Sequence, residues 1–372
     1  MASLRCSSLR KLVLQNSSKS SLPNYFSPGP SLARTFASSS SSSSTSTSPA
    51  SSSSSSTLPP VYVSHIPYRV PYSLGLALQE AIYALRGEPE VLLLLEHTPV
   101  YTEGRRGAQD DGSTAAAEAQ AELERQTGQR LRELGADYHV TKRGGLITYH
   151  GPGQLVGYPI LRLSNMNLSN RCYVDRLQDS LSSLLQSHYT LPTVPPPDGN
   201  TGVWSTPDLK IVSIGVQVRH RISSHGFALN VSTEVLPWFR RIVACGIQGK
   251  GMTCMQSEMA RRIGEEEMQR PDRGASEREG ERMQEAGFEK GGGGVIKDGL
   301  EGRQEVGEAP LGPEAKMLTV QSVAPQVAKA LGKTFKRELV QADEELLRYE
   351  ADADGVLTRC WLQGKEVKAE TV

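Results

Sequence analysis

The sequence lacks a long hydrophobic run, has few aromatic residues and carries no excess of either charge. Its nearest approach to a membrane span is Val91–Leu95, whereas a spanning helix needs about 20 apolar residues. Aromatic residues make up 6% of the chain, and 41 basic residues balance 41 acidic ones. A net charge of zero gives no general attraction for nucleic acid. We therefore expect no membrane span and no nucleic-acid partner.

Cysteine is also scarce. The five cysteines (Cys6, Cys172, Cys245, Cys254 and Cys360) are odd in number and scattered along the chain. This spacing fits neither a disulfide framework nor a zinc site built from cysteine pairs. We expect free thiols in a reducing compartment, no bound metal and no cofactor.

Acidic residues are absent from the N-terminal region: none precedes Glu80, while arginine and lysine recur among many serines. This composition is typical of an organelle transit peptide. Arg34–Ala37 resembles a matrix-processing site, and 38–57 is almost entirely serine. The sequence favours a transit peptide and serine-rich tract at 1–57 and a mitochondrial matrix location. Chloroplast targeting and an ordinary disordered tail are the alternatives.

Hydrophobic periodicity predicts an α/β domain with helices on a mixed sheet. Apolar residues recur at helical spacing after Pro71 and again over 320–331, and Val91–Leu95 is typical of a strand buried on both faces. We expect the main domain at 58–257, with an insertion at 108–136 that could form an exposed helix. Residues 258–313 are charged and glycine-rich and predict a disordered insertion. The last part, 314–372, is predicted to be a helical portion of the same domain.

The block Arg143–Gln154 is rich in glycine and polar residues around a short apolar stretch. Where glycine replaces side chains, backbone can approach a ligand closely. The block therefore predicts a ligand loop. The alternative is a tight hairpin in which His150 is a core histidine.

Two neighbouring strands are predicted at Lys210–Arg219 and His225–Val231. The small residues Gly226 and Ala228 would leave a groove beside Ser213–Gly215, wide enough for a slender apolar ligand. Lys210 stands at the beginning of the first strand, where a lysine is more often a solvated surface group.

Cys245 lies between Ala244 and Gly246, and a glycine at this position lets the chain turn sharply and expose the sulfur. The commoner fate of a cysteine is structural burial. Cys245 is nevertheless the candidate nucleophile of the sequence.

Four ordered blocks together resemble the lipoyl (octanoyl) transferases, which share the catalytic fold of biotin and lipoate protein ligases. The resemblance covers about 61–256 and rests on Arg143–Gln154, Pro207–Gly215, His225–Asn230 and Ala244–Gly246. The sequence departs from the family at Leu146, where a polar residue is usual, and in its two insertions.

The resemblance implies a cysteine nucleophile, Cys245, and a lysine acid/base, Lys210. It also implies a set of residues that line the acyl pocket: Arg143, Gly144, Gly145, Leu146, Ile147, Thr148, Tyr149, His150, Ser213, Ile214, Gly215, Gly226, Phe227 and Ala228. The donor would be octanoyl-acyl carrier protein. The acceptors would be lipoyl domains of 2-oxoacid dehydrogenases and the H-type carrier of glycine cleavage, and the enzyme is expected to be a monomer.

Three other functions are compatible with parts of the pattern. An ATP-dependent lipoate or biotin ligase has the same fold, but it activates its acid as an adenylate and does not require the Cys245 and Lys210 pair. A non-catalytic module could hold acylated domains without chemistry. A cysteine hydrolase could use Cys245 with His150 or His225 and would release free fatty acid.

Overall fold

The computed structural model describes residues 58–104, 114–242, 249–269 and 312–369. The predicted targeting segment 1–57 and Cys245 lie outside these ranges. Residues 58–372 belong to one compact unit. In the described ranges, no helix is long and apolar enough to cross a membrane.

A mixed eight-stranded sheet forms the centre of this unit, as the sequence predicted. Its strands in spatial order are β10 (Gly251–Met252), β8 (Leu209–Arg219), β9 (Ile222–Asn230), β6 (Gln154–Ile160), β2 (Glu90–His97), β1 (Val61–Val70) and β11 (Leu339–Gln341), with β7 (Val203–Trp204) beside β8. The pairs β10–β8, β1–β2 and β1–β11 are parallel, and the other neighbours are antiparallel. Because β2 is central, its apolar run is buried on both faces.

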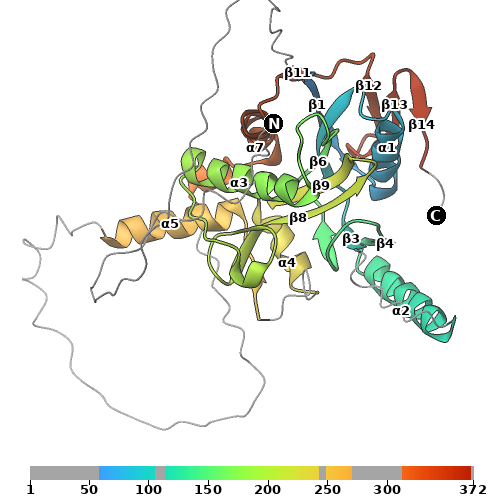
Figure 1. The fold of residues 1–372 in the computed structure, drawn as a ribbon. Helices are drawn as coiled ribbons and strands as arrows, with labels where there is room; N and C mark the ends of the chain where they lie inside the picture. The colour runs from blue at the N-terminus through green and yellow to red at the C-terminus, as the bar shows by residue number, and fades with distance from the viewer. Residues whose placement is uncertain (1–57, 105–113, 243–248, 270–311, 370–372) are drawn as a thin grey trace, which may run out of the picture. The chain divides into compact units, whose positions relative to one another are not determined.

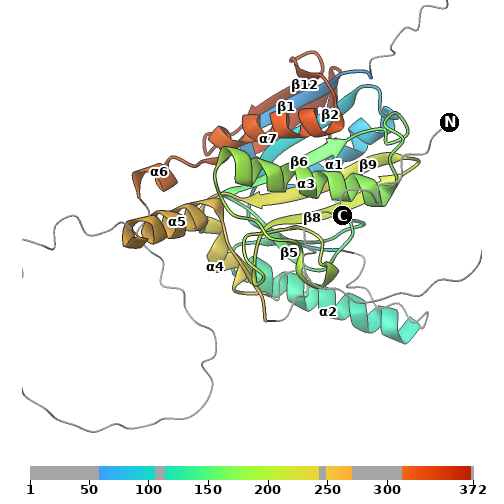
Figure 2. The same cartoon turned by 60° about the vertical axis from the view of Figure 1, so that its left-hand side comes forward.

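Helices cover one face of the sheet, and one helix with a small sheet covers the other (Figures 1 and 2). On the first face, α3 (Asn170–His188) and α7 (Val320–Phe335) lie side by side and bury leucines, valines and Tyr173 against Leu92 and Leu155. On the second face, α1 (Tyr72–Ala84) packs with the C-terminal strands. The helical spacing of the apolar residues in α1 and α7 thus reflects two separate cores.

A second sheet carries the middle of the glycine-rich block. It contains β4 (Asp137–Val140), β3 (Val100–Glu103) and β5 (Thr148–His150) in this order. The predicted insertion forms a helix, α2 (Thr114–Glu133), that connects the parallel strands β3 and β4. Leu131 of α2 and Tyr138 of β4 enter the same apolar cluster, so the end of this insertion is packed against the domain.

The predicted helical C-terminal part is wrong beyond Phe335. Residues 314–335 contain α6 (Pro313–Lys316) and α7, but the chain then forms β11 and a three-stranded antiparallel sheet. Its strands are β12 (Leu347–Ala351), β13 (Leu357–Leu362) and β14 (Lys365–Val367). The helical prediction for 314–372 fails here because Leu339 pairs with Val61, so its backbone groups bond to the edge of the sheet.

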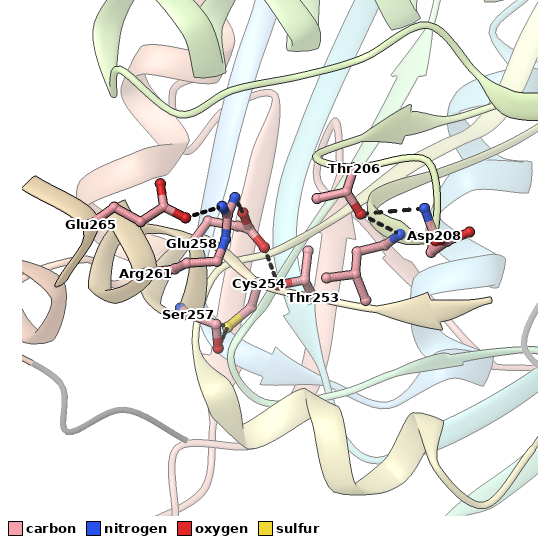
Figure 3. Close-up of polar contacts among 9 residues, drawn as sticks. Thr206, Asp208, Thr253, Cys254, Ser257, Glu258, Arg261 and Glu265 are labelled. Carbon is pink, nitrogen blue, oxygen red and sulfur yellow. Dashed lines mark hydrogen bonds and ion pairs between the residues drawn. The ribbon is translucent and has the colours of Figure 1, made fainter. Parts of the chain in front are cut away.

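The first part of the predicted disordered insertion 258–313 is helical, since α5 spans Met255–Gln269. Residues 270–311 lie outside the described ranges. Figure 3 shows why the helix begins here: the Glu258 carboxylate accepts a hydrogen bond from Thr253 at 2.7 Å and pairs with Arg261, which also pairs with Glu265. Such i,i+3 and i,i+4 pairs support a helix, and charge content alone did not distinguish them from a solvated loop.

The two regions of the chain on either side of this insertion are joined by a buried ion pair. Arg337 pairs with Glu90 at the start of β2, and both side chains are 1% exposed. Arg337 Nε also donates to the Pro59 carbonyl at 2.8 Å, and Glu90 Oε1 accepts from the Arg162 amide at 2.6 Å. One guanidinium therefore fixes the beginning of β1, the beginning of β2 and the end of α7.

Arg337→Met should lower the free energy of unfolding by about 3–5 kcal/mol, because it leaves the Glu90 carboxylate buried without its counter-charge. The free energy of unfolding is measured by chemical denaturation, both for the full chain and for a shortened protein that begins at Leu58. Arg359→Met is the control: Arg359 pairs with Glu366 at the surface with 53% of its side chain exposed, and its loss should cost less than about 1 kcal/mol. Equal effects of the two substitutions would contradict the assignment.

Candidate functional site

A pocket of about 490 Å³, including its open mouth, lies where the glycine-rich block crosses β6, β9 and β8. Twelve of the fourteen residues predicted to line it do so: Arg143, Gly144, Gly145, Leu146, Thr148, His150, Ser213, Ile214, Gly215, Gly226, Phe227 and Ala228. They come from three separate parts of the sequence. The sheet brings these parts together through the pairing of Ser213 with Ala228 and of Gly215 with Gly226.

Ile147 and Tyr149 do not line the pocket, in contrast to the prediction. Successive residues of an extended strand face opposite sides, so Thr148 and His150 face the pocket while these two face away. The Tyr149 ring stacks on Trp238 with a centroid separation of 5.2 Å and an interplanar angle of 5°. The prediction that every residue from Arg143 to His150 lines the pocket does not account for this alternation.

Glycines on three adjacent strands let the segments around the pocket pack closely against one another. A side chain at Gly226 would meet the Gly157 carbonyl oxygen, and its Cβ would lie 2.6 Å from Pro159 Cδ. A Cβ at Gly215 would lie 2.9 Å from the carbonyl oxygen of Gly144. The Gly144 amide donates to the Val216 carbonyl at 3.2 Å. The loop that begins at Arg143 is therefore pressed directly onto the backbone of β8.

Arg143 holds this loop from inside. Its guanidinium donates to the Thr102 carbonyl at 2.6 Å, to the Thr102 hydroxyl at 2.8 Å and to the Gly144 carbonyl at 3.0 Å. The residue is buried, with 7% of its surface exposed. Its positive charge helps to lower the pKa values of the pocket histidines. The residue is thus part of the pocket wall rather than a surface cation.

Four lining residues were missed by the sequence prediction: Tyr72, Val156, Tyr158 and His225. Tyr72 is the first residue of α1, and no sequence pattern places a helix start beside a strand that follows 80 residues later. Val156 and Tyr158 could have been found, because they alternate along β6 directly after the glycine-rich block. His225 opens one of the blocks that carried the family resemblance.

Burial lowers the pKa values of the two pocket histidines, His150 and His225, and of His97, which is bonded to Tyr158. Burial lowers the pKa of His97 to about 4 and that of His225 to about 3, and burial also places the pKa of His150 well below its usual value. His97 Nδ1 donates to the Val70 carbonyl at 2.7 Å, which leaves Nε2 to accept from the Tyr158 hydroxyl at 2.7 Å. His150 Nδ1 donates to Gln154 Oε1 at 2.7 Å. These contacts fix which ring nitrogen carries the proton.

A chain of side-chain amides connects the pocket with the beginning of β8. Gln154 Nε2 donates to Asn230 Oδ1 at 2.9 Å, and Asn230 Nδ2 donates to the Thr253 carbonyl at 2.8 Å. The Thr253 amide in turn donates to the Lys210 carbonyl at 2.9 Å. Because every member is buried, this network is costly to disturb and sets the position of Lys210 relative to His150.

Lys210 lies at the beginning of β8, outside the pocket lining. The residue is 3% exposed; its Nζ donates to the Thr201 carbonyl at 3.0 Å and lies 4.7 Å from the centre of the Trp204 ring. A buried, held ammonium differs from the solvated surface lysine that is the commoner case.

Cys245 and Cys254 lie close together in the sequence, but only Cys254 lies in the described ranges. Its residue is fully buried, its Sγ lies 3.2 Å from the Ser257 hydroxyl, and burial raises the pKa of its thiol (Figure 3). A buried thiol with a raised pKa is a poor nucleophile. Cys254 directly precedes α5, and its Sγ accepts a hydrogen bond from the Ser257 amide at 3.4 Å, so it caps the beginning of that helix. Within the described residues, no group of three or more His, Cys, Asp or Glu side chains could hold a metal ion.

Comparison with known proteins gives one matching family model, the lipoyl protein ligase A/B catalytic domain, over residues 71–271. The mitochondrial octanoyl-acyl-carrier-protein:protein N-octanoyltransferase of Xenopus tropicalis is 45% identical over 46% of this chain and 64% of its own length. The Homo sapiens protein of the same name is 41% identical over 55% of this chain and 86% of its own length. An octanoyltransferase of Rubrobacter xylanophilus is 42% identical over 54% of this chain and 85% of its own length.

Among solved structures, lipoate-protein ligase A bound with ATP matches with a TM-score of 0.46 and 10% identity, covering 76% of this chain and 88% of that protein.

Gly226→Ala should lower the free energy of unfolding by about 1–3 kcal/mol or more, because the new methyl group would collide with the Gly157 carbonyl and Pro159. Gly144→Ala is the matched control: its Cβ would lie 3.7 Å from the nearest atom, the Val216 carbonyl oxygen. That substitution should be neutral or stabilise by less than about 1 kcal/mol. Urea denaturation of the two variants provides the comparison, and equal stability would refute the close strand approach.

Proposed function

The chain belongs to the lipoyl protein ligase A/B catalytic domain family, with octanoyltransferases among its relatives, and on this premise we propose that it transfers an octanoyl group through a cysteine thioester. The donor is octanoyl-acyl carrier protein, and the acceptor is the specific lysine of a lipoyl domain. Acceptors include the lipoyl domains of 2-oxoacid dehydrogenases and the H-type carrier of glycine cleavage. This reaction is the first step of protein lipoylation from an endogenous acyl chain.

The observation that carries the proposal is the parallel pairing of β10 with the beginning of β8. Gly251 pairs with Leu209, and Met252 pairs with Lys210. The strand that follows Cys245 by only a few residues therefore runs beside the buried lysine. This arrangement supports the assignment of Cys245 as nucleophile and Lys210 as its acid/base partner.

In the first half of the reaction, the Cys245 thiolate attacks the carbonyl carbon of the carrier thioester. A new carbon–sulfur bond forms, and the bond to the carrier sulfur breaks as that sulfur takes a proton. An ammonium at Lys210 favours the thiolate through opposite charge and supplies this proton. The products are the octanoyl-enzyme and the free carrier thiol.

In the second half, the lysine amine of the lipoyl domain attacks the octanoyl-enzyme. The neutral amine attacks through its lone pair, and Lys210, neutral after the first half, accepts the proton that the nitrogen releases as the amide forms. A carbon–nitrogen bond forms and the Cys245 sulfur leaves with its electron pair. The amide product remains on the lipoyl domain, and the enzyme returns to its starting state without nucleotide.

The pocket suits a medium acyl chain because its central walls are apolar. Val156, Ile214, Phe227 and Ala228 line it. Each methylene transferred from water into such an environment gains about 0.8 kcal/mol. The vertebrate relatives are named as mitochondrial, which supports the matrix as the site of action.

We expect the purified protein to acquire an octanoyl adduct when it is mixed with octanoyl-carrier protein in the absence of ATP and acceptor. Intact and peptide mass spectrometry would locate the adduct at Cys245. Addition of a lipoyl domain should discharge it to a lysine amide, and release of free octanoate instead would indicate a hydrolase. Acylation that appears only with ATP would replace the proposal with the ligase function.

Cys245→Ser should abolish the adduct that forms with thioester donors, because a serine hydroxyl is a far weaker nucleophile at neutral pH. Lys210→Met should reduce the rate of adduct formation by about 10²–10⁴-fold, the usual contribution of a general acid/base. Cys172→Ala provides the control, since Cys172 lies half-buried on α3 away from the pocket. Full activity of Cys245→Ser would exclude the thioester route.

A further inference from the structure

The strand that runs beside Lys210 is very short. β10 contains only Gly251 and Met252, and among the described strands it is the last at this edge of the sheet. The Gly251 amide donates to the Asp208 carbonyl at 2.7 Å. The Thr253 amide, directly after the strand, donates to the Lys210 carbonyl at 2.9 Å. Strands usually span about 5–6 residues, so the attachment of β10 to β8 depends on contacts outside the sheet as well.

Thr253 supplies such contacts, because it is bonded in three directions. Besides its amide bond to Lys210, its carbonyl accepts from Asn230 Nδ2 at 2.8 Å. Its hydroxyl donates to Glu258 Oε1 at 2.7 Å (Figure 3). The residue is 3% exposed. The first two bonds use backbone groups, so the bond to Glu258 is the one that requires a hydroxyl at this position.

The partner of this hydroxyl is a buried carboxylate. The Glu258 side chain is 2% exposed and lies in the first turn of α5. Burying a carboxylate is costly unless it has hydrogen bonds and a counter-charge. Arg261, with 37% of its side chain exposed, supplies the counter-charge. A negative charge near a helix N-terminus also stabilises the helix, but that benefit requires neither burial nor a bond to Thr253.

We propose that Thr253 and Glu258 form a positioning pair for Lys210, an inference that rests on the proposed role of Lys210 as acid/base. Neither residue is among those that line the pocket, so both act through Lys210. Glu258 fixes the side chain of Thr253, and Thr253 fixes the backbone carbonyl of Lys210. The lysine Nζ is held at the other end by the Thr201 carbonyl at 3.0 Å. α5 thereby determines where the lysine side chain begins.

Thr253→Val tests the pair, because it keeps the shape of the side chain and both backbone bonds but deletes the hydroxyl. The measurement is the rate of octanoyl adduct formation at increasing concentrations of octanoyl-carrier protein, without acceptor. We expect the maximal rate to fall about tenfold, since misplacement of a reacting group by about 1 Å can cost about 100-fold. The carrier concentration that gives half this rate should stay within about twofold. Thr253→Ser, which retains a hydroxyl, should restore the rate.

A double-mutant cycle distinguishes an effect through Lys210 from a general loss of structure. In the Lys210→Met background, Thr253→Val should change the rate by less than about twofold, because the group that it positions is already absent. Glu258→Leu, which removes the acceptor of the same hydrogen bond, should show the same dependence on Lys210. An equal fall in both backgrounds would make the pair purely structural and overturn the proposal.

Ser64→Ala is the matched control. Ser64 is 4% exposed, and its hydroxyl lies 2.9 Å from the Tyr349 hydroxyl, between β1 and the C-terminal sheet. This variant also loses a hydrogen-bonded hydroxyl, but it should form the adduct at the unsubstituted rate. An unchanged rate in Thr253→Val, or an equal fall in Ser64→Ala, would overturn the positioning pair and leave the proposed transfer intact. An unsubstituted protein that forms no adduct would instead overturn the proposed function.

Discussion

The close approach of three strand backbones is the constraint on which the site depends. Gly157, Gly215 and Gly226 lie on the neighbouring strands β6, β8 and β9, and a side chain at any of them would collide with a neighbouring strand, loop or ring. Their small size lets the loop from Arg143 rest on the backbone of β8. A sheet normally covers its face with side chains, and here backbone and ring atoms from neighbouring segments lie directly against the glycines.

Polar groups inside this space must then be satisfied, and the structure does this in two ways. His97, His150 and Gln154 are fixed by hydrogen bonds to protein. Burial lowers the pKa values of the histidines, and the neutral form avoids the cost of burying charge. The pocket therefore combines apolar walls with polar side chains that are held in fixed positions.

The sequence predicts features that depend on residues close together in the chain better than features that depend on contacts between distant residues. Glycine-rich blocks and the apolar run of β2 are local signals, and they located most of the pocket and the mixed sheet. The contribution of Tyr72 arises from packing between α1 and a strand distant in sequence, which no local pattern encodes. The segment around Leu339 was predicted to be helical because a short apolar spacing fits both a helix and an edge strand. Its pairing with Val61 makes it a strand. Ile147 and Tyr149 were misplaced although strand alternation would have excluded them.

The hydrogen-bonded centre of this site lies outside the two predicted insertions. The first, 108–136, lies between β3 and β4, and the second, 258–313, contains most of α5 and ends at the start of α6. The amide chain from Gln154 through Asn230 to Thr253 crosses neither insertion. Since this chain links the pocket to the backbone of Lys210, the distance between the pocket and Lys210 is set within the central sheet and its hydrogen-bonded neighbours.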